Sequence, residues 1–186
     1  MIAPYIAQWH EAIRDGAVDN TYKMAWARSI VELATESAPA DEPEKVITFA
    51  EIADRVLRAF WDQTIFFELV QSPNLLKRPE ILQHTEELIA TYRKSAGTRP
   101  VKYVRVDFVG AELEEGRAAA LMKIGSTLKK DVCWRFLRVN RCEYPLYRLD
   151  VDGGQLVFGK EEVRLIAEYS DFLFDAISYR WAQILE

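Results

Sequence analysis

Apolar residues at helical spacing, interrupted at intervals by proline or glycine, dominate the N-terminal half and constrain the fold more than any other feature. Ile6, Trp9 and Ile13 recur at helical spacing between Pro4, which suits a first helical turn, and Gly16. The same pattern predicts three further helices, over residues 21–36, 49–71 and 79–96. Because 49% of the 186 residues are hydrophobic, these helices can bury a sizeable core.

Local signals support these boundaries. Thr48 and Glu51 form a capping box at the start of the third helix, which is expected to reach Gln71. Pro79 suits the start of the fourth helix, and Gly97 ends it.

The C-terminal half begins with a less clear pattern. Residues 100–110 fit either a two-residue alternation or a helical face, and we favour the helix. Residues 111–128 are rich in alanine and predict a helix, and residues 160–186 predict one long helix that runs to the end of the chain.

Signals for β-structure are confined to one region. After Lys130 the apolar residues alternate, and two strand-like segments flank Asp152-Gly153-Gly154, a strong hairpin signal. We therefore expect a mainly α fold: one mostly helical domain over residues 1–186, with a small antiparallel hairpin or sheet near residues 131–159.

Charge is unevenly distributed along this acidic chain, whose net charge is −5. Residues 77–148 carry 15 Lys and Arg against 9 Asp and Glu, whereas acidic residues prevail on both sides. The whole excess lies between residues 117 and 148, in Arg117, Lys123, Lys129, Lys130, Arg135, Arg138, Arg141 and Arg148. A basic region on an acidic protein predicts an anionic partner met at one face, while a solvated face that binds nothing is the alternative.

Motifs for several other functions are missing from the sequence. It has no phosphate-binding loop, no GxSxG and no GxGxxG, and His10 and His84 lack a second histidine at ligand spacing. Asp150 and Asp152 resemble the opening of a calcium loop, but a hairpin turn explains them better. Cys133 and Cys142 are expected to be free thiols. We therefore expect no catalytic residues, no metal ligands and no cofactor in this chain.

Two stretches together resemble a known family. NTYKMAWARSIVELA, the helix ITFAEIADRVLRAFW and the closing RWAQILE resemble the region that precedes the nuclease domain in bacterial HNH-type restriction endonucleases. CEYPLYRLDVDGGQLVF resembles a segment of the sulfur-binding domains of modification-dependent members, which recognise phosphorothioated DNA.

The resemblance implies site residues and a partner. Tyr144 and Pro145 would form an apolar pocket for the sulfur, with Arg148 at its rim and Tyr22 and Lys23 on a facing helix. It also implies that the chain is the recognition part of a longer protein, truncated before a C-terminal HNH nuclease domain. The partner would be double-stranded DNA, with the basic residues contacting phosphates.

A second hypothesis comes from another functional class. The chain would be a helical interaction or oligomerisation domain, for example a homodimer, in which Leu173, Ile177 and Trp181 are exposed for a partner. An enzyme in its own right is the third and least supported hypothesis. No apolar run is long enough to span a membrane, so a cytoplasmic protein without a membrane partner is expected.

Overall fold

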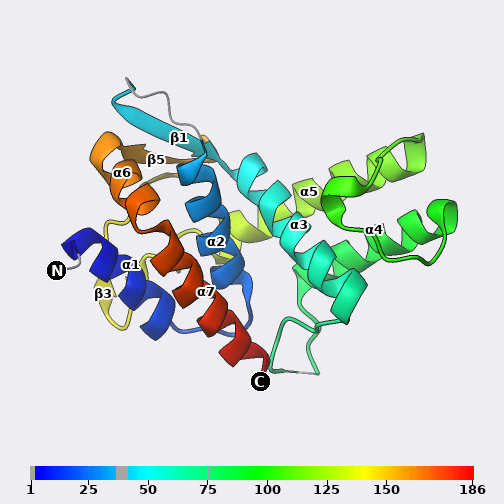
Figure 1. Ribbon diagram of the computed structural model, residues 1–186, viewed down its shortest axis with the longest axis horizontal. Coiled ribbons are helices and arrows are strands. Elements are labelled where there is room, and N and C mark those ends of the chain that lie inside the picture. Colours follow the sequence, from blue (N-terminus) through cyan, green and yellow to red (C-terminus); the bar gives the residue numbers. More distant parts are fainter. Residues whose placement is uncertain (1–2, 37–41, 75) are drawn as a thin grey trace.

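The computed structural model describes residues 3–36, 42–74 and 76–186, which fold mainly as helices (Figure 1). The helices are α1 (Pro4–Asp15), α2 (Tyr22–Thr35), α3 (Phe49–Phe67), α4 (Glu80–Ala96), α5 (Ala111–Asp131), α6 (Lys160–Glu168) and α7 (Ser170–Leu185), with a 3-10 turn, η1, at Tyr103–Arg105. The strands are β1 (Glu44–Thr48), β2 (Arg138–Val139), β3 (Cys142–Glu143), β4 (Arg148–Asp150) and β5 (Gln155–Gly159). The predicted mainly α fold is confirmed.

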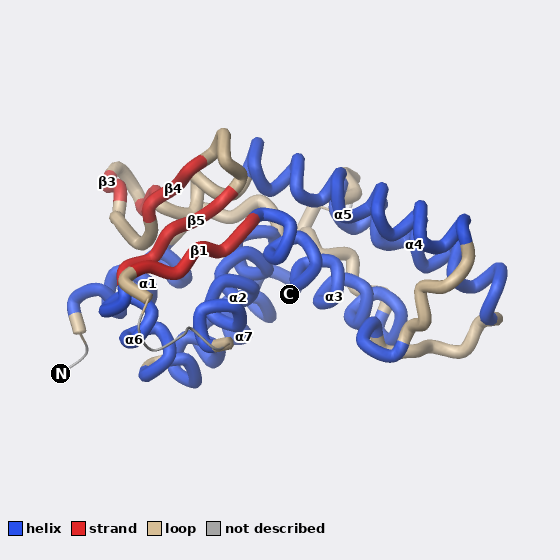
Figure 2. The backbone as a smooth tube through the Cα atoms, turned by 90° about the horizontal axis from the view of Figure 1, so that it is seen from above, coloured by secondary structure: helices blue, strands red, loops and turns tan. Residues whose placement is uncertain are grey.

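The elements form two parts, which we call the arm and the body. The arm consists of α3, α4, α5 and η1, which pack on one another and extend away from the other helices (Figure 1). In the body, α2 packs against α6 and α7, and it also contacts α3. Figure 2 shows α4 and α5 side by side along the arm and the larger sheet at the other end of the molecule. α5 runs back toward the body, and the turns of residues 132–137 connect it to the β2–β3 hairpin.

The larger sheet is antiparallel, with strand order β1-β5-β4. The predicted hairpin is confirmed as β4 and β5. In its turn the Asp150 carboxylate accepts hydrogen bonds from the Gly153 backbone N–H, at 2.9 Å, and from Gln155 Nε2, at 3.0 Å. The Asp150 carboxylate is thus used within the turn. β1 was not predicted from the sequence, because its partner β5 is more than a hundred residues away in the chain.

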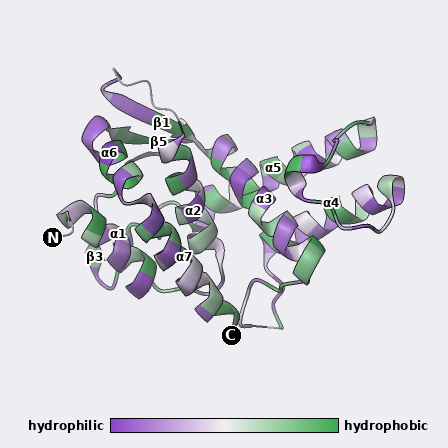
Figure 3. Ribbon diagram, in the orientation of Figure 1, coloured by the Kyte–Doolittle hydropathy of each residue, from purple (hydrophilic) through white to green (hydrophobic). Residues whose placement is uncertain are grey.

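One continuous cluster of buried apolar side chains runs through the arm and the body, from Ile6 to Ile184. The alternation of apolar and polar residues along the helices is visible in Figure 3. Leu173, Ile177 and Trp181 belong to this cluster and are at most 4% exposed. The hypothesis that these three residues await a partner is therefore wrong: they pack inside the protein's own core. None of the described helices combines the length and apolar character needed to cross a bilayer.

Three predicted boundaries were wrong. α3 ends at Phe67 rather than Gln71, because Glu68 adopts a left-handed conformation with φ 54°. Residues 100–110 form only the short η1 turn. The predicted final helix is two helices that meet at Tyr169. Both pack on α1 and α2, and α6 also packs on β5 and β1.

The expected strand after Lys130 was also wrong. Residues 132–137 form turns, and the Phe136 backbone N–H donates to the Val132 carbonyl at 3.0 Å. Val132, Cys133, Phe136 and Leu137 are buried, a spacing of four residues that fits helical turns rather than a strand. Strand pairing begins only at Arg138, in the short hairpin that β2 forms with β3.

Candidate nucleic-acid interface

The last turn of α5 presents two lysines to solvent. Lys129 and Lys130 are both exposed, and neither has an ion-pair partner among the described residues. The helix dipole places about half a negative charge at this end, which favours lysines there but cannot neutralise both. This end of the arm therefore carries net positive charge.

Trp134 links these lysines to two arginines. Its indole Nε1 donates to the Lys130 carbonyl at 2.9 Å, which fixes the half-buried ring against the end of α5. The guanidinium carbons of Arg135 and Arg138 lie 5.0 Å and 4.8 Å from the centre of the ring. Both distances are within the range of cation–π attraction, so the ring holds two charged groups close together.

The β2–β3 hairpin extends this charged surface. Arg138 belongs to β2, and the exposed residues Asn140 and Arg141 form the two-residue turn before β3. Asn140 has φ 56°, the left-handed conformation that asparagine tolerates and a tight hairpin turn needs. Within the described ranges, Arg138 and Arg141 make no ion pair.

Lys23 approaches the same surface from the start of α2. Its Nζ donates to the Ala17 carbonyl at 2.6 Å. Burial lowers the pKa of the Lys23 ammonium, and the positive charge of Arg135 lowers it further. We refer to Lys23, Lys129, Lys130, Trp134, Arg135, Arg138 and Arg141 together as the Trp134 platform.

Three acidic residues adjoin the Trp134 platform. Asp131 lies 3.7 Å from Arg135, and Glu143 stands opposite Arg138 in the hairpin register. The negative charge of Asp19 acts on the Lys23 ammonium and partly offsets the lowering of its pKa. They offset only part of the charge of six cationic side chains. The platform therefore keeps a positive balance on a protein that is acidic overall.

The predicted basic residues outside the platform have other partners. Arg117 lies on α5, thirteen residues before Lys130, which corresponds to about 20 Å along a helix. Its guanidinium binds the Asp54 carboxylate at 2.9 Å and donates to the Tyr103 hydroxyl at 2.9 Å, so it holds α5 against α3 and η1. The prediction that Arg117 belongs to one basic face with the lysines at the end of α5 was wrong.

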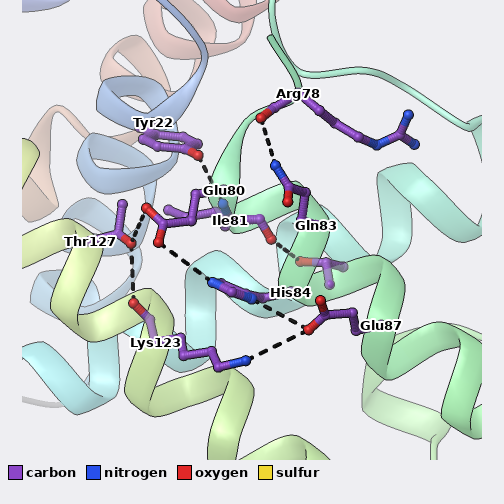
Figure 4. Close-up of polar contacts among 10 residues, drawn as sticks. Tyr22, Arg78, Glu80, Ile81, Gln83, His84, Glu87, Lys123 and Thr127 are labelled. Carbon is purple, nitrogen blue, oxygen red and sulfur yellow. Dashed lines mark hydrogen bonds and ion pairs between the residues drawn. The ribbon is translucent and has the colours of Figure 1, made fainter.

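Lys123 and Arg148 face carboxylates. Lys123 Nζ lies 3.8 Å from Glu87 on α4 (Figure 4), and Arg148 lies 3.3 Å from Glu44 on β1. Lys123 thus belongs to the contact between α4 and α5, and Arg148 to the sheet. The structure places both outside the Trp134 platform.

Tyr22 is buried rather than exposed to a ligand. Its hydroxyl accepts a hydrogen bond from the Ile81 backbone N–H at 2.8 Å, which satisfies a free donor in the first turn of α4 (Figure 4). Burial raises the pKa of the Tyr22 hydroxyl to about 12. The prediction that Tyr22 contacts DNA was wrong, because the side chain is part of the core.

Tyr144 and Pro145, predicted to form the sulfur pocket, lie after β3. Pro145 is exposed, and the half-buried Tyr144 donates its hydroxyl hydrogen to the Glu11 carboxylate on α1. This hydrogen bond raises the pKa of the Tyr144 hydroxyl. A carboxylate at this position disfavours an anionic phosphorothioate, and Tyr22 and Arg148 bind other groups. Recognition of phosphorothioated DNA stays a prediction.

Trp134 is a functional candidate that was not identified from the sequence. It is half-buried, and two arginines lie over its ring. The pattern Trp-Arg-x-x-Arg could have indicated this, since both arginines can fold back onto the ring within one turn.

Other types of site are not assembled. Within the described ranges, no group of three or more His, Cys, Asp or Glu side chains is placed to hold a metal ion. Cys133 and Cys142 are free, as expected. A cleft of about 570 Å³ between α3 and α4 is lined by Thr64, Glu68, Arg78, Glu86, Ile89, Ala90 and Arg93. Arg78 is already paired with Glu86 there.

Comparisons of the chain with protein-family models, with curated proteins and with solved structures found no match. The resemblance to HNH-associated recognition regions therefore rests on the sequence stretches that carry it, and the functional argument rests on the geometry of the Trp134 platform.

Proposed function

We propose that this protein binds double-stranded DNA through the Trp134 platform, as a recognition module without catalytic residues of its own. One observation carries the proposal: six cationic side chains lie on one surface of an acidic protein. Five of them have no ion-pair partner among the described residues. Such a surface attracts the phosphate backbone, while the acidic remainder keeps a polyanion from binding elsewhere.

The arrangement of the arginines supports phosphate binding. Stacking on Trp134 limits the side-chain conformations of Arg135 and Arg138, so less entropy is lost when they bind. Each guanidinium can still offer N–H groups to phosphate oxygens. These contacts would fix the position of the duplex without reading its sequence.

A charge-reversal pair tests the proposal. We expect Lys129→Glu with Lys130→Glu to weaken binding to a fluorescent duplex at least tenfold, because two attractive contacts become repulsive. Lys123→Glu with Arg148→Glu is the matched control, since it changes the net charge equally but outside the platform. Fluorescence anisotropy gives both dissociation constants, and thermal melting verifies the folding of each variant.

Salt dependence provides a second readout of the same experiment. The logarithm of the affinity should fall with the logarithm of the salt concentration by about 0.9 for each phosphate that is neutralised. If both double variants weakened DNA binding equally, the Trp134 platform would not be part of the interface. A phosphorothioated duplex in the same titration tests the sulfur prediction. That prediction requires the wild-type protein to bind this duplex more tightly than the unmodified one, and it requires Pro145→Ala to lose the preference.

A further inference from the structure

The tip of the β2–β3 hairpin differs from the rest of the Trp134 platform. The side chains of Arg135 and Arg138 stack on Trp134, whereas Asn140 and Arg141 stand at the turn, exposed and without a side-chain hydrogen bond or ion pair in the described ranges. The tip therefore keeps its full capacity for hydrogen bonding with a ligand.

We propose that this tip enters the major groove of the bound duplex, where Arg141 donates to the N7 and O6 acceptors of a guanine. The inference rests on the proposed function, since it names the part of the DNA that the same surface would read. Arginine and asparagine are the side chains best suited to guanine and adenine edges in that groove.

The dimensions of the hairpin fit this role. A two-stranded ribbon fits the major groove, which is about 12 Å wide and about 8.5 Å deep. Asn140 and Arg141 lie two positions beyond the Arg138–Glu143 pair, which corresponds to about 7 Å along the hairpin. If Arg138 binds a phosphate at the groove edge, Arg141 can reach the bases.

Duplex pools made with 7-deazaguanine and 7-deazaadenine test the inference. Replacing N7 by C–H removes an acceptor from the major groove but leaves the phosphates and base pairing unchanged. We expect the wild-type protein to bind this pool about tenfold more weakly than an ordinary pool of the same sequences. Arg141→Ala should bind the ordinary pool about tenfold more weakly than the wild type does. Its affinity for the modified pool should be nearly the same as its affinity for the ordinary pool.

Arg148→Ala serves as the matched control, because it removes an exposed arginine outside the platform and should retain the wild-type sensitivity to the modified pool. Equal wild-type binding to both pools would overturn the groove inference. If Lys129→Glu with Lys130→Glu still weakened that binding, the proposed function would stand. Failure of the wild type to bind either pool would overturn both proposals.

Discussion

At the scale of single residues, the surroundings of a charged group decide what it can do. Arg117 and Arg138 are both arginines from the same basic stretch of sequence. Arg117 is bound to Asp54 and Tyr103, whereas Arg138 rests on an indole ring and has no ion-pair partner in the described part of the chain. Only the second is available to a phosphate. The partners of Arg117 are distant in the sequence, so its state could not be read from neighbouring residues.

Lys23 gives a prediction about pH. Its pKa lies below the ordinary value, mainly because the side chain is partly buried and also because Arg135 is close. The protonated form binds phosphate, so affinity for DNA should fall as the pH rises through this lowered pKa. Lys23→Arg should keep the affinity constant over the same range, because arginine stays protonated. Anisotropy titrations at increasing pH measure this, and identical pH profiles for the two proteins would contradict the role of Lys23.

At the scale of elements, side chains that join two helices explain why the arm keeps its position on the body. Tyr22 of α2 supplies an acceptor to the Ile81 N–H at the start of α4, which has no capping side chain of its own. Its ring also packs against Phe60 of α3, with ring centres 6.1 Å apart. One residue thus connects three helices.

Tyr22→Phe should therefore destabilise the protein by about 1–3 kcal/mol, because it leaves a buried N–H without an acceptor. For a chain of this size we expect a melting temperature several degrees lower. Tyr179→Phe, at an exposed position, is the control.

Deprotonation of Tyr22 is expected to lower the stability of the protein at high pH. Burial raises the pKa of Tyr22 to about 12, above its value in the unfolded chain. The contribution of Tyr22 to the free energy of unfolding is therefore complete below pH 10 and is lost as the pH rises through 12. Tyr22→Phe should show less of this loss than the wild type. An equal alkaline decline in both proteins would assign the effect to other groups.

At the scale of the whole molecule, a buried glutamine ties the C-terminal helix to the start of α2. Gln71 is fully buried after α3, and its Oε1 accepts hydrogen bonds from Thr21 Oγ1 at 2.8 Å and from Trp181 Nε1 at 3.0 Å. It also has φ 64°, a conformation that is rare for residues other than glycine. These bonds hold the chain segment after α3 against α2 and α7.

Gln71→Leu should cost about 2–4 kcal/mol, because it keeps most of the side-chain volume but leaves the Thr21 hydroxyl and the Trp181 indole N–H without an acceptor. Gln83→Leu, at an exposed position of α4, is the control. Chemical denaturation monitored by tryptophan fluorescence measures both. Equal denaturation midpoints for the two variants would show that water accepts the hydrogen bonds of Thr21 and Trp181 in place of the glutamine.

The sequence by itself determined the features that depend on neighbouring residues. The capping box at Thr48 and Glu51, the proline at the start of α1, Gly97 after α4 and the turn at Gly153 act over a few residues. Most helix starts, several helix ends and the β4–β5 hairpin could therefore be predicted, as could a basic region between residues 117 and 148.

Only the tertiary structure decided which basic residues stand together. Docking of α3 and α4 onto α5 brings Asp54 to Arg117 and Glu87 to Lys123, and pairing of β1 with β5 brings Glu44 near Arg148. These partners are distant in the sequence, and hydrophobic burial between the elements, rather than charge, positions them. Among the basic residues between 117 and 148, those at the end of α5 and in the hairpin that follows have few carboxylate partners in the described part of the chain. The Trp134 platform therefore emerged from the fold.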